Sequence, residues 1–388
     1  QLPVSMLDFS QLSPQLASFA EHSSSDGDAL GLRIERALLA LGECSGRWET
    51  LAEEARAFRT WLVALPHEPP DAKHPPTVRP TPITVVATDG SQVFPDRHRE
   101  PHCYLLNVSR VAFQYGTQEQ PLIESIPRLG FDKEMVQDAL EALMQQARPE
   151  LVSAMRDQLE LETLFQTAED SGVAGRPLVA LADGTLIPWM LKGRSGQGDA
   201  SAFEQMYADT LARFRANRIP VASYVSMPAS TEVVNLLRLA RGECNGVSTA
   251  LDETLDGMTD RHLFEDTLLP GERSALFGSL SHVLATYHEE DRIRFFYLHV
   301  PATRTSPSEV ARVELPAWVA ADTALVDLIH AVLLSECDKG EGYPMILSEA
   351  HERAVIRAKE RDVFYSLIER ERPHAMSRKS ASKRIPAA

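Results

Sequence analysis

Two short, mostly apolar runs dominate the pattern along the chain, and the first is rich in β-branched residues. They are Ile83–Thr88 (ITVVAT) and Pro177–Ala182 (PLVALA), and each leads into Asp-Gly followed by a hydroxyl residue. A short apolar run that stops at a turn signal is typical of a buried strand. Similar runs predict three further strands, at Tyr104–Tyr115, Val221–Ser226 and Ile293–Val300.

Helical spacing of apolar residues fills much of the remaining chain. Ala29–Leu65 has helix-forming composition with apolar residues at helical spacing, and predicts one long or broken amphipathic helix. The same pattern predicts helices at Asp132–Thr167, Ala202–Ala216, Glu232–Arg241, Ala321–Glu336 and Glu349–Glu371. Because strands and helices alternate, the fold class is α/β with a parallel or mixed sheet.

A proline-rich stretch divides the chain. Pro66–Pro82 contains seven prolines and predicts an extended connector, since proline cannot continue a helix. We therefore expect an N-terminal helical arm with its connector at residues 1–80, a main domain at 81–372 and a disordered basic tail at 373–388. Gly242–Glu290 fits the strand and helix pattern poorly and is interpreted as an inserted helical element.

Composition narrows the function. The formal charge is 39 − 55 = −16, which argues against a protein that coats nucleic acid by bulk electrostatics. No run of 18 uncharged apolar residues and no basic, apolar leader occurs, so we expect a soluble, cytoplasmic protein without a membrane span. The four cysteines are far apart and form no CxxC pair, which indicates neither a zinc ribbon nor a disulfide framework.

Asp89 and Asp183 are the first candidates for chemistry. Each follows a predicted strand, and ligands of α/β sheets bind at the carboxyl ends of the strands. Carboxylate oxygens suit magnesium or manganese, and the following glycine lets a ligand approach. Strand-Asp-Gly is also an ordinary turn in which the carboxylate bonds local amides, so these residues alone leave a structural role open.

A resemblance over much of the chain adds to this interpretation. Five segments resemble the NurA nuclease family and occur in the family's order: TDGSQVFPDRH, LADGTLIPW, SYVSMPASTEVVNLLR, DRHLFEDTLLPGERSALF and GYPMILSEAHERAVI. The resemblance implies an RNase H-like mixed sheet flanked by helices and Mn²⁺- or Mg²⁺-dependent cleavage of DNA. It also implies 5′–3′ exonuclease action with single-strand endonuclease activity, a role in DNA end resection and repair, a HerA-type hexameric helicase/translocase partner, and a homodimer.

The resemblance also assigns catalytic positions. Asp89 and Asp183 match the family's two catalytic aspartates, and Tyr343 and His351 match its C-terminal active-site segment. The family has a further glutamate on the helix before the second aspartate. Here Glu160 or Glu162 can fill that position, about 200 degrees apart on the helix, and Glu160 is preferred because the apolar stripe lies near its side.

These matches define the expected metal site and its competitors. We expect Asp89, Glu160, Asp183 and His351 to hold the metal ion, with His351 in the first turn of a helix capped by Ser348. Two other functions stay open, a non-catalytic adaptor of a DNA translocase and a ribonuclease on the same fold. Metal-site residues alone do not separate DNA from RNA as the substrate.

Overall fold

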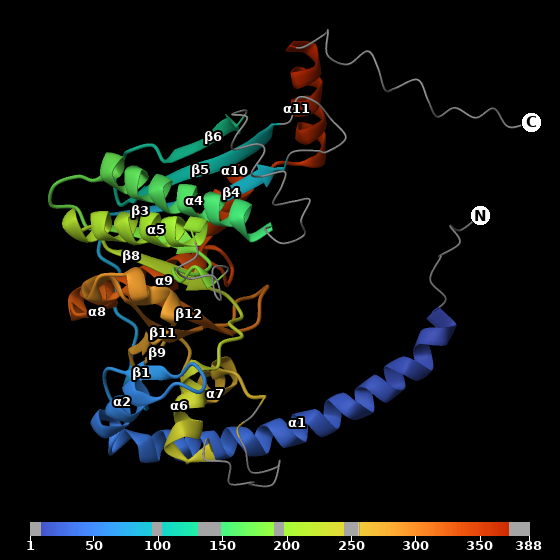
Figure 1. The fold of residues 1–388 in the computed structure, drawn as a ribbon, viewed down its shortest axis with the longest axis vertical. Helices are drawn as coiled ribbons and strands as arrows, with labels where there is room; N and C mark the ends of the chain where they lie inside the picture. Colours follow the sequence, from blue (N-terminus) through green and yellow to red (C-terminus); the bar gives the residue numbers. More distant parts are fainter. Residues whose placement is uncertain are drawn as a thin grey trace, which may run out of the picture.

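The computed structural model describes residues 9–94, 103–130, 149–189, 198–243, 255 and 257–371. The twelve strands within these ranges form one mixed sheet (Figure 1). Its order is β1 (Ala64–Pro66), β10 (Phe277–Ser279), β11 (Ile293–Val300), β12 (Glu309–Pro316), β8 (Val221–Val225), β7 (Leu178–Asp183), β3 (Ile83–Thr88), β5 (Tyr104–Tyr115) and β4 (Gly90–Val93). Off this path, β6 (Leu122–Gly130) pairs with β5, and β9 (Arg273–Ser274) pairs with β11 and with β2 (Lys73–His74).

The half of the sheet from β6 to β8 has a simple connectivity. Strands β3 to β6 follow one another in the chain, and β5 pairs antiparallel with β3 and β4 on one side and with β6 on the other. Helix α4 (Pro149–Ser171) then leads to β7, which lies parallel to β3, and α5 (Gly198–Ala216) leads to β8, parallel to β7. This arrangement confirms the expected RNase H-like mixed α/β sheet, and the five strands predicted from the sequence are all present.

Helices cover both faces of these strands. Because side chains of a strand alternate between faces, β3 contributes residues to both cores. Val85 and Ala87 of β3 pack in one core with α9 (Thr323–Lys339) and α10 (Met345–Ala354). The residue between them, Val86, packs on the other face with Leu164 of α4 and Leu211 of α5. Strand β3 therefore reads as one continuous apolar run, which is why the sequence marks it so clearly.

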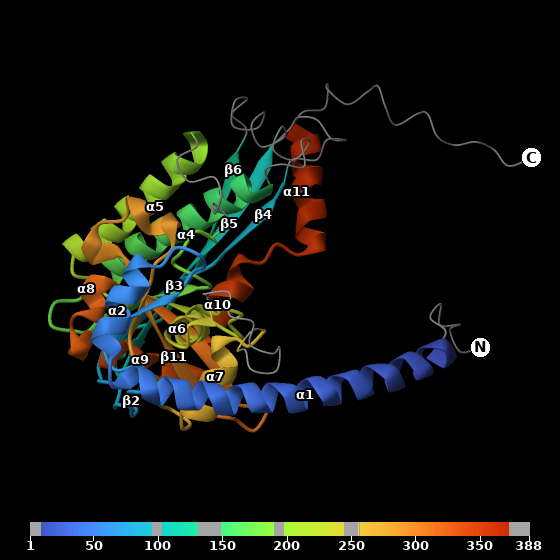
Figure 2. The ribbon, with the colours of Figure 1, turned by 60° about the horizontal axis from the view of Figure 1, so that its bottom comes forward.

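The N-terminal helices differ from the predicted one. Helix α1 spans Phe9–Ser45 and α2 spans Trp48–Ala57, so the helical arm begins well before Ala29 and is broken in two. The carboxyl-terminal part of α1 packs against α6 (Glu232–Ala240) and α7 (Asp260–Thr267). Its amino-terminal end stands clear of the body in both views (Figures 1 and 2).

Segments predicted as connector and insertion contribute strands. Residues 66–82 include β2 and the end of β1, which pair with β9 and β10. Within 242–290, the described residues supply α7 together with β9 and β10, and both strands pair with β11. The division of the chain into an arm, a main domain and a tail stays a prediction. Residues 131–148 of the predicted helix and the tail at 373–388 lie outside the described residues.

The last predicted helix is two helices. Helix α10 ends at Ala354, and α11 begins at Ala358 and ends at Glu371. The carbonyl oxygen of Ala354 accepts hydrogen bonds from the side chains of Asn107 (2.8 Å) and Ser91. Those side chains satisfy an orphan carbonyl at the helix end, which favours a stop there. In the part of the chain that is described, we find no helix with the length and apolar character that crossing a membrane requires.

Candidate active site

Asp89 and Asp183 lie next to each other at one edge of the parallel strands. The pairing of β3 with β7 runs as far as Thr88 opposite Ala182, and each aspartate is the next residue. Asp89 joins β3 to β4 and stays bonded to β5. Its backbone N–H donates to Ser109 Oγ (3.0 Å), and its carbonyl oxygen accepts from the backbone N–H of Ser109 (2.9 Å). The cleft described below lies where the pairing of β3 with β7 ends.

The turn after Asp183 is also held by backbone geometry. Gly184 has φ +80°, a left-handed conformation that glycine adopts without strain. Its N–H donates to the carbonyl oxygen of Tyr224 on β8 at 3.0 Å. The glycine of this Asp-Gly pair is therefore required by the turn itself.

Helix α4 brings Glu160 over the first aspartate. Thr88 Oγ1 donates to the backbone oxygen of Glu160 at 3.1 Å, which ties the helix to the end of β3. A Cβ atom on Gly90 would collide with the Glu160 carboxylate, so the glycine of the first Asp-Gly pair makes room for this glutamate. Glu162 lies on the other side of the helix, about half exposed at 51%, and forms an ion pair with Arg213 (3.5 Å).

Two cleft residues on α4 were not predicted from the sequence. Arg156 Nε lies 2.9 Å from Glu160 Oε1, and Arg156 Nη2 lies 2.7 Å from Asp157 Oδ1. The contact with Glu160 is an ion pair without hydrogen-bond geometry, and Glu160 Oε1 is buried with no hydrogen-bond partner. The only signal for Asp157 was its place one turn before Glu160, and a charged residue there reads as a solvated helix face.

The C-terminal segment supplies one partner to each aspartate. The His351 ring atom Nδ1 lies 2.8 Å from Asp89 Oδ2, and the Tyr343 hydroxyl donates to Asp183 Oδ1 at 2.7 Å. Helix α10 begins at Met345 after Pro344, so His351 lies in its last turn and Ser348 is inside the helix. The expected first-turn position was wrong because proline, whose φ is already helical, starts this helix four residues before the serine.

These side chains line a cleft of about 410 Å³. Its walls carry four carboxylates, one guanidinium and one imidazole, from Asp89, Asp157, Glu160, Asp183, Arg156 and His351. With all four carboxylates ionised, at least two negative charges (4 − 2) have no cation even if the imidazole is protonated. The cleft is therefore acidic.

Burial and neighbouring carboxylates raise the pKa values of Glu160 and Asp183. Burial raises the pKa of Glu160 well above its usual range, with Asp157, Asp89 and Asp183 raising it further and Arg156 opposing them. Burial also raises the pKa of Asp183, the Tyr343 hydrogen bond lowers it, and Asp89 raises it. Like charges that disfavour one another's ionised form mark a site that lacks a cation.

Donor chemistry and charge fit a divalent metal ion. Hard carboxylate oxygens are the ligands of Mg²⁺ and Mn²⁺, and the buried Glu160 Oε1 has no hydrogen bond to give up. As the side chains lie, however, no three His, Cys, Asp or Glu side chains among the described residues are already arranged as a metal-binding group. Each of the three carboxylates already has a partner: Asp89 contacts His351, Asp183 contacts Tyr343 and Glu160 contacts Arg156.

The fold and the cleft together define an RNase H-like α/β domain with an acidic site at the carboxyl ends of two parallel strands. Comparison with protein families matches residues 83–356 to the NurA domain. The chain therefore belongs to the NurA family and carries a nuclease domain of that family. All five candidate site residues, Asp89, Glu160, Asp183, Tyr343 and His351, lie inside the matched range.

Three solved structures are similar to the chain at low identity. The NurA nuclease from Sulfolobus solfataricus is 15% identical over 78% of this chain and 87% of that one, with a TM-score of 0.46. Drosophila Piwi is 11% identical over 70% and 29% of the two chains, with a TM-score of 0.29. LC9-RNase H1 is 13% identical over 44% and 76%, with a TM-score of 0.21. A search of curated proteins finds no match. The family assignment accordingly rests on the domain match.

Proposed function

We propose that this protein is a metal-dependent DNA nuclease whose active site is the acidic cleft. The observation that carries the proposal is the convergence of Asp89, Glu160 and Asp183 from two strand ends and one helix on a cleft with uncompensated negative charge. A cleft with this charge repels the phosphates of DNA unless cations neutralise it. A nuclease with such a site therefore needs a metal ion both to bind its substrate and to cleave it.

Asp89, Glu160 and Asp183 would hold Mn²⁺ or Mg²⁺. A bound divalent ion at this place supplies charge neutralisation on the phosphate and lowers the pKa of a water molecule for attack. Asp89 and Asp183 are presented by strand ends whose backbones are hydrogen-bonded to neighbouring strands, so their positions change little on loading. Glu160 is the ligand that must release its present partner, Arg156.

The residues around the carboxylates have separate roles in this proposal. His351 is bound to Asp89 through Nδ1, which leaves Nε2 as the ring atom for proton exchange with the leaving oxygen or for completing the metal site. Tyr343 orients the Asp183 carboxylate through its hydroxyl. Arg156, released from Glu160, is placed to contact a phosphate oxygen, a role that suits a guanidinium.

The finer features of the activity follow the family resemblance. We infer 5′–3′ exonuclease action with single-strand endonuclease activity, in DNA end resection and repair beside a HerA-type hexameric translocase. We infer a homodimer as well, and the projecting end of α1 offers a surface for a second copy (Figure 2). Support for these features is the membership of the NurA family.

Cleavage of three labelled substrates tests the proposal. Single-stranded DNA, duplex DNA and RNA of one sequence are incubated with the protein in Mn²⁺, in Mg²⁺ and in chelator. The expected result is cleavage of DNA with metal and none with chelator, with 5′-end label released first. Metal-dependent cleavage of RNA alone would make the protein a ribonuclease, and absence of cleavage with retained translocase binding would make it an adaptor.

A further inference from the structure

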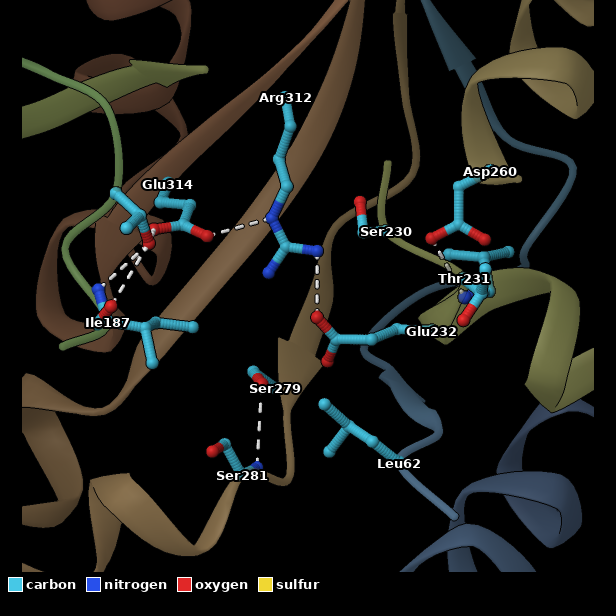
Figure 3. A network of polar contacts seen from close by, with 12 residues as sticks. Leu62, Ile187, Ser230, Thr231, Glu232, Asp260, Ser279, Ser281, Arg312 and Glu314 are labelled. Carbon is cyan, nitrogen blue, oxygen red and sulfur yellow. Dashed lines mark hydrogen bonds and ion pairs between the residues drawn. The ribbon is translucent and has the colours of Figure 1, made fainter. Parts of the chain in front are cut away.

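A second charged cluster is buried around Arg312 of β12 (Figure 3). It contacts Thr185, one of the residues that line the cleft. Arg312 of β12 is 3% exposed, and its guanidinium lies between two glutamates. Arg312 Nη1 lies 2.8 Å from Glu232 Oε1 at the start of α6, and Arg312 Nε donates to Glu314 Oε1 at 2.8 Å. The guanidinium also lies 3.6 Å above the ring of Phe295.

Glu314 reaches from this cluster to the turn that carries Asp183. Its second oxygen, Oε2, accepts hydrogen bonds from the Thr185 hydroxyl (2.7 Å) and the Leu186 backbone N–H (2.8 Å). Thr185 Oγ1 in turn accepts from the backbone N–H of Ile187 at 3.0 Å. The turn after Asp183 is thus bound to β12 by one carboxylate and, through Gly184, to β8.

Stability alone does not account for a carboxylate at this place. Desolvation of buried ions costs about as much as their attraction returns, and apolar residues of similar volume often serve the fold equally well. Glu314 is 1% exposed, and a single Arg312–Glu232 pair would already be balanced in charge. The second glutamate adds a negative charge, and apart from the bond from Arg312 its hydrogen bonds among the described residues come from the Asp183 turn.

The geometry points to Glu314 as a positioning residue that holds the turn of Asp183 in the conformation required by the metal site. This inference rests on the proposed function, because the cleft is taken to hold a divalent ion. Side chains that support a ligand from outside the site keep it within a narrow range of productive geometry, and their loss typically lowers metal affinity by 10- to 100-fold. Arg312 holds Glu314 in turn through Nε, and its Nη1 pairs with Glu232.

Two matched substitutions test the inference. Glu314→Leu leaves Arg312 paired with Glu232 and removes the oxygen that accepts both hydrogen bonds of the turn. Glu232→Leu leaves Arg312 paired with Glu314 and keeps the turn bonded. Each variant therefore retains one neutral ion pair. Binding of Mn²⁺ is measured by calorimetry without DNA, and hydrogen exchange of the peptide containing Leu186 is followed by mass spectrometry.

In Glu314→Leu we expect Mn²⁺ affinity about tenfold lower than in the wild type, faster exchange at the turn, and a lower kcat with little change in KM. Glu232→Leu keeps the affinity and exchange within about twofold of the wild type. Glu314→Gln, which retains one acceptor, recovers part of the loss. Equal losses in the two leucine variants, or wild-type behaviour of Glu314→Leu, would overturn the inference.

A third pair of variants serves if Glu314→Leu does not fold. Thr185→Val removes the hydroxyl donor to Glu314, and Thr185→Ser keeps it. The inference predicts weaker Mn²⁺ binding in the valine variant and recovery in the serine variant, and equal behaviour of the two would contradict it. If the wild-type protein binds no Mn²⁺, the proposed function fails, while exchange at Leu186 still decides whether Glu314 orders the turn.

Discussion

The Arg312 cluster and the acidic cleft both consist of one arginine among carboxylates, with a histidine added in the cleft, and they differ in net charge and in exposure to water. Arg312 and its two glutamates are at most 4% exposed, with one positive charge against two negative. In the cleft, which holds four carboxylates, Arg156 is 30% exposed and forms ion pairs with two of them, Asp157 and Glu160. With its groups ionised, the buried cluster carries one excess negative charge and supports structure. The open cleft carries at least two excess negative charges, and this excess is the reason for which we propose a bound cation.

Removing the arginine from each cluster gives the largest expected contrast. Arg312→Met leaves Glu232 and Glu314 buried without a cation, which is expected to cost about 3–5 kcal/mol of unfolding free energy. Arg156→Met leaves two partly buried carboxylates, Asp157 and Glu160, whose raised pKa values let them take up a proton in place of the cation, and we expect a smaller loss, below about 2 kcal/mol. Urea unfolding of both variants measures the difference. Similar losses of unfolding free energy in the two variants would mean that the difference in solvent exposure does not set the stability cost of losing the arginine.

Neutralising an aspartate in the cleft should affect activity and leave the fold intact. Asp89→Asn and Asp183→Asn keep the side-chain shape and remove a metal ligand. We expect cleavage to fall on the order of 100-fold or more, about 2.7 kcal/mol of barrier, and unfolding free energy to change by less than about 1 kcal/mol. Nuclease assays and urea unfolding are run on the same preparations. Activity within about tenfold of the wild type would remove the aspartate in question from the metal site.

The sequence predicted the cleft where local pattern carries the information. Asp89 and Asp183 end short apolar runs, and such runs need no knowledge of distant partners to be recognised as strands. The family resemblance implied a glutamate on this helix, and helical phase favoured Glu160 over Glu162, since the apolar residues around it define the inward side of α4. The structure places it in the cleft and Glu162 outside, although their roles stay proposals.

The buried cluster was invisible to the same reasoning. Arg312 and Glu314 alternate with apolar residues in β12, and this pattern reads as a strand with one solvated face. What buries that face is α6 and the turn after Asp183, which lie far away in the chain. The start of α1 was missed for a related reason, because Pro14 and Gly27 disfavour a helix that the structure nevertheless continues through both.

The two glutamates of α4 sharpen the boundary of the cleft. Glu160→Gln should lower cleavage on the order of 30-fold, about 2 kcal/mol of barrier, because this carboxylate lies in the cleft against Gly90, the residue after Asp89. Glu162→Gln is the matched control on the same helix, and its loss of an exposed ion pair with Arg213 should leave cleavage within about twofold. Steady-state rates in Mn²⁺ compare the two. A larger effect at Glu162 would place the metal on the outer side of the helix.

The smallest predicted effect is a stabilisation by metal that only the cleft produces. A ligand that binds the folded state alone at ten times its Kd stabilises by about 1.4 kcal/mol. For a chain of this length that corresponds to a rise of roughly 2 °C in Tm. We expect Mn²⁺ to raise the Tm of the wild type and of Glu162→Gln and to leave Asp183→Asn unchanged, as measured by calorimetry at constant ionic strength. Ca²⁺ and added NaCl separate specific binding from screening, because screening acts on every exposed carboxylate and would raise the Tm of all three proteins alike. A rise in Asp183→Asn equal to that of the wild type would show that the ion binds elsewhere, and the excess negative charge of the cleft would then need another counterion.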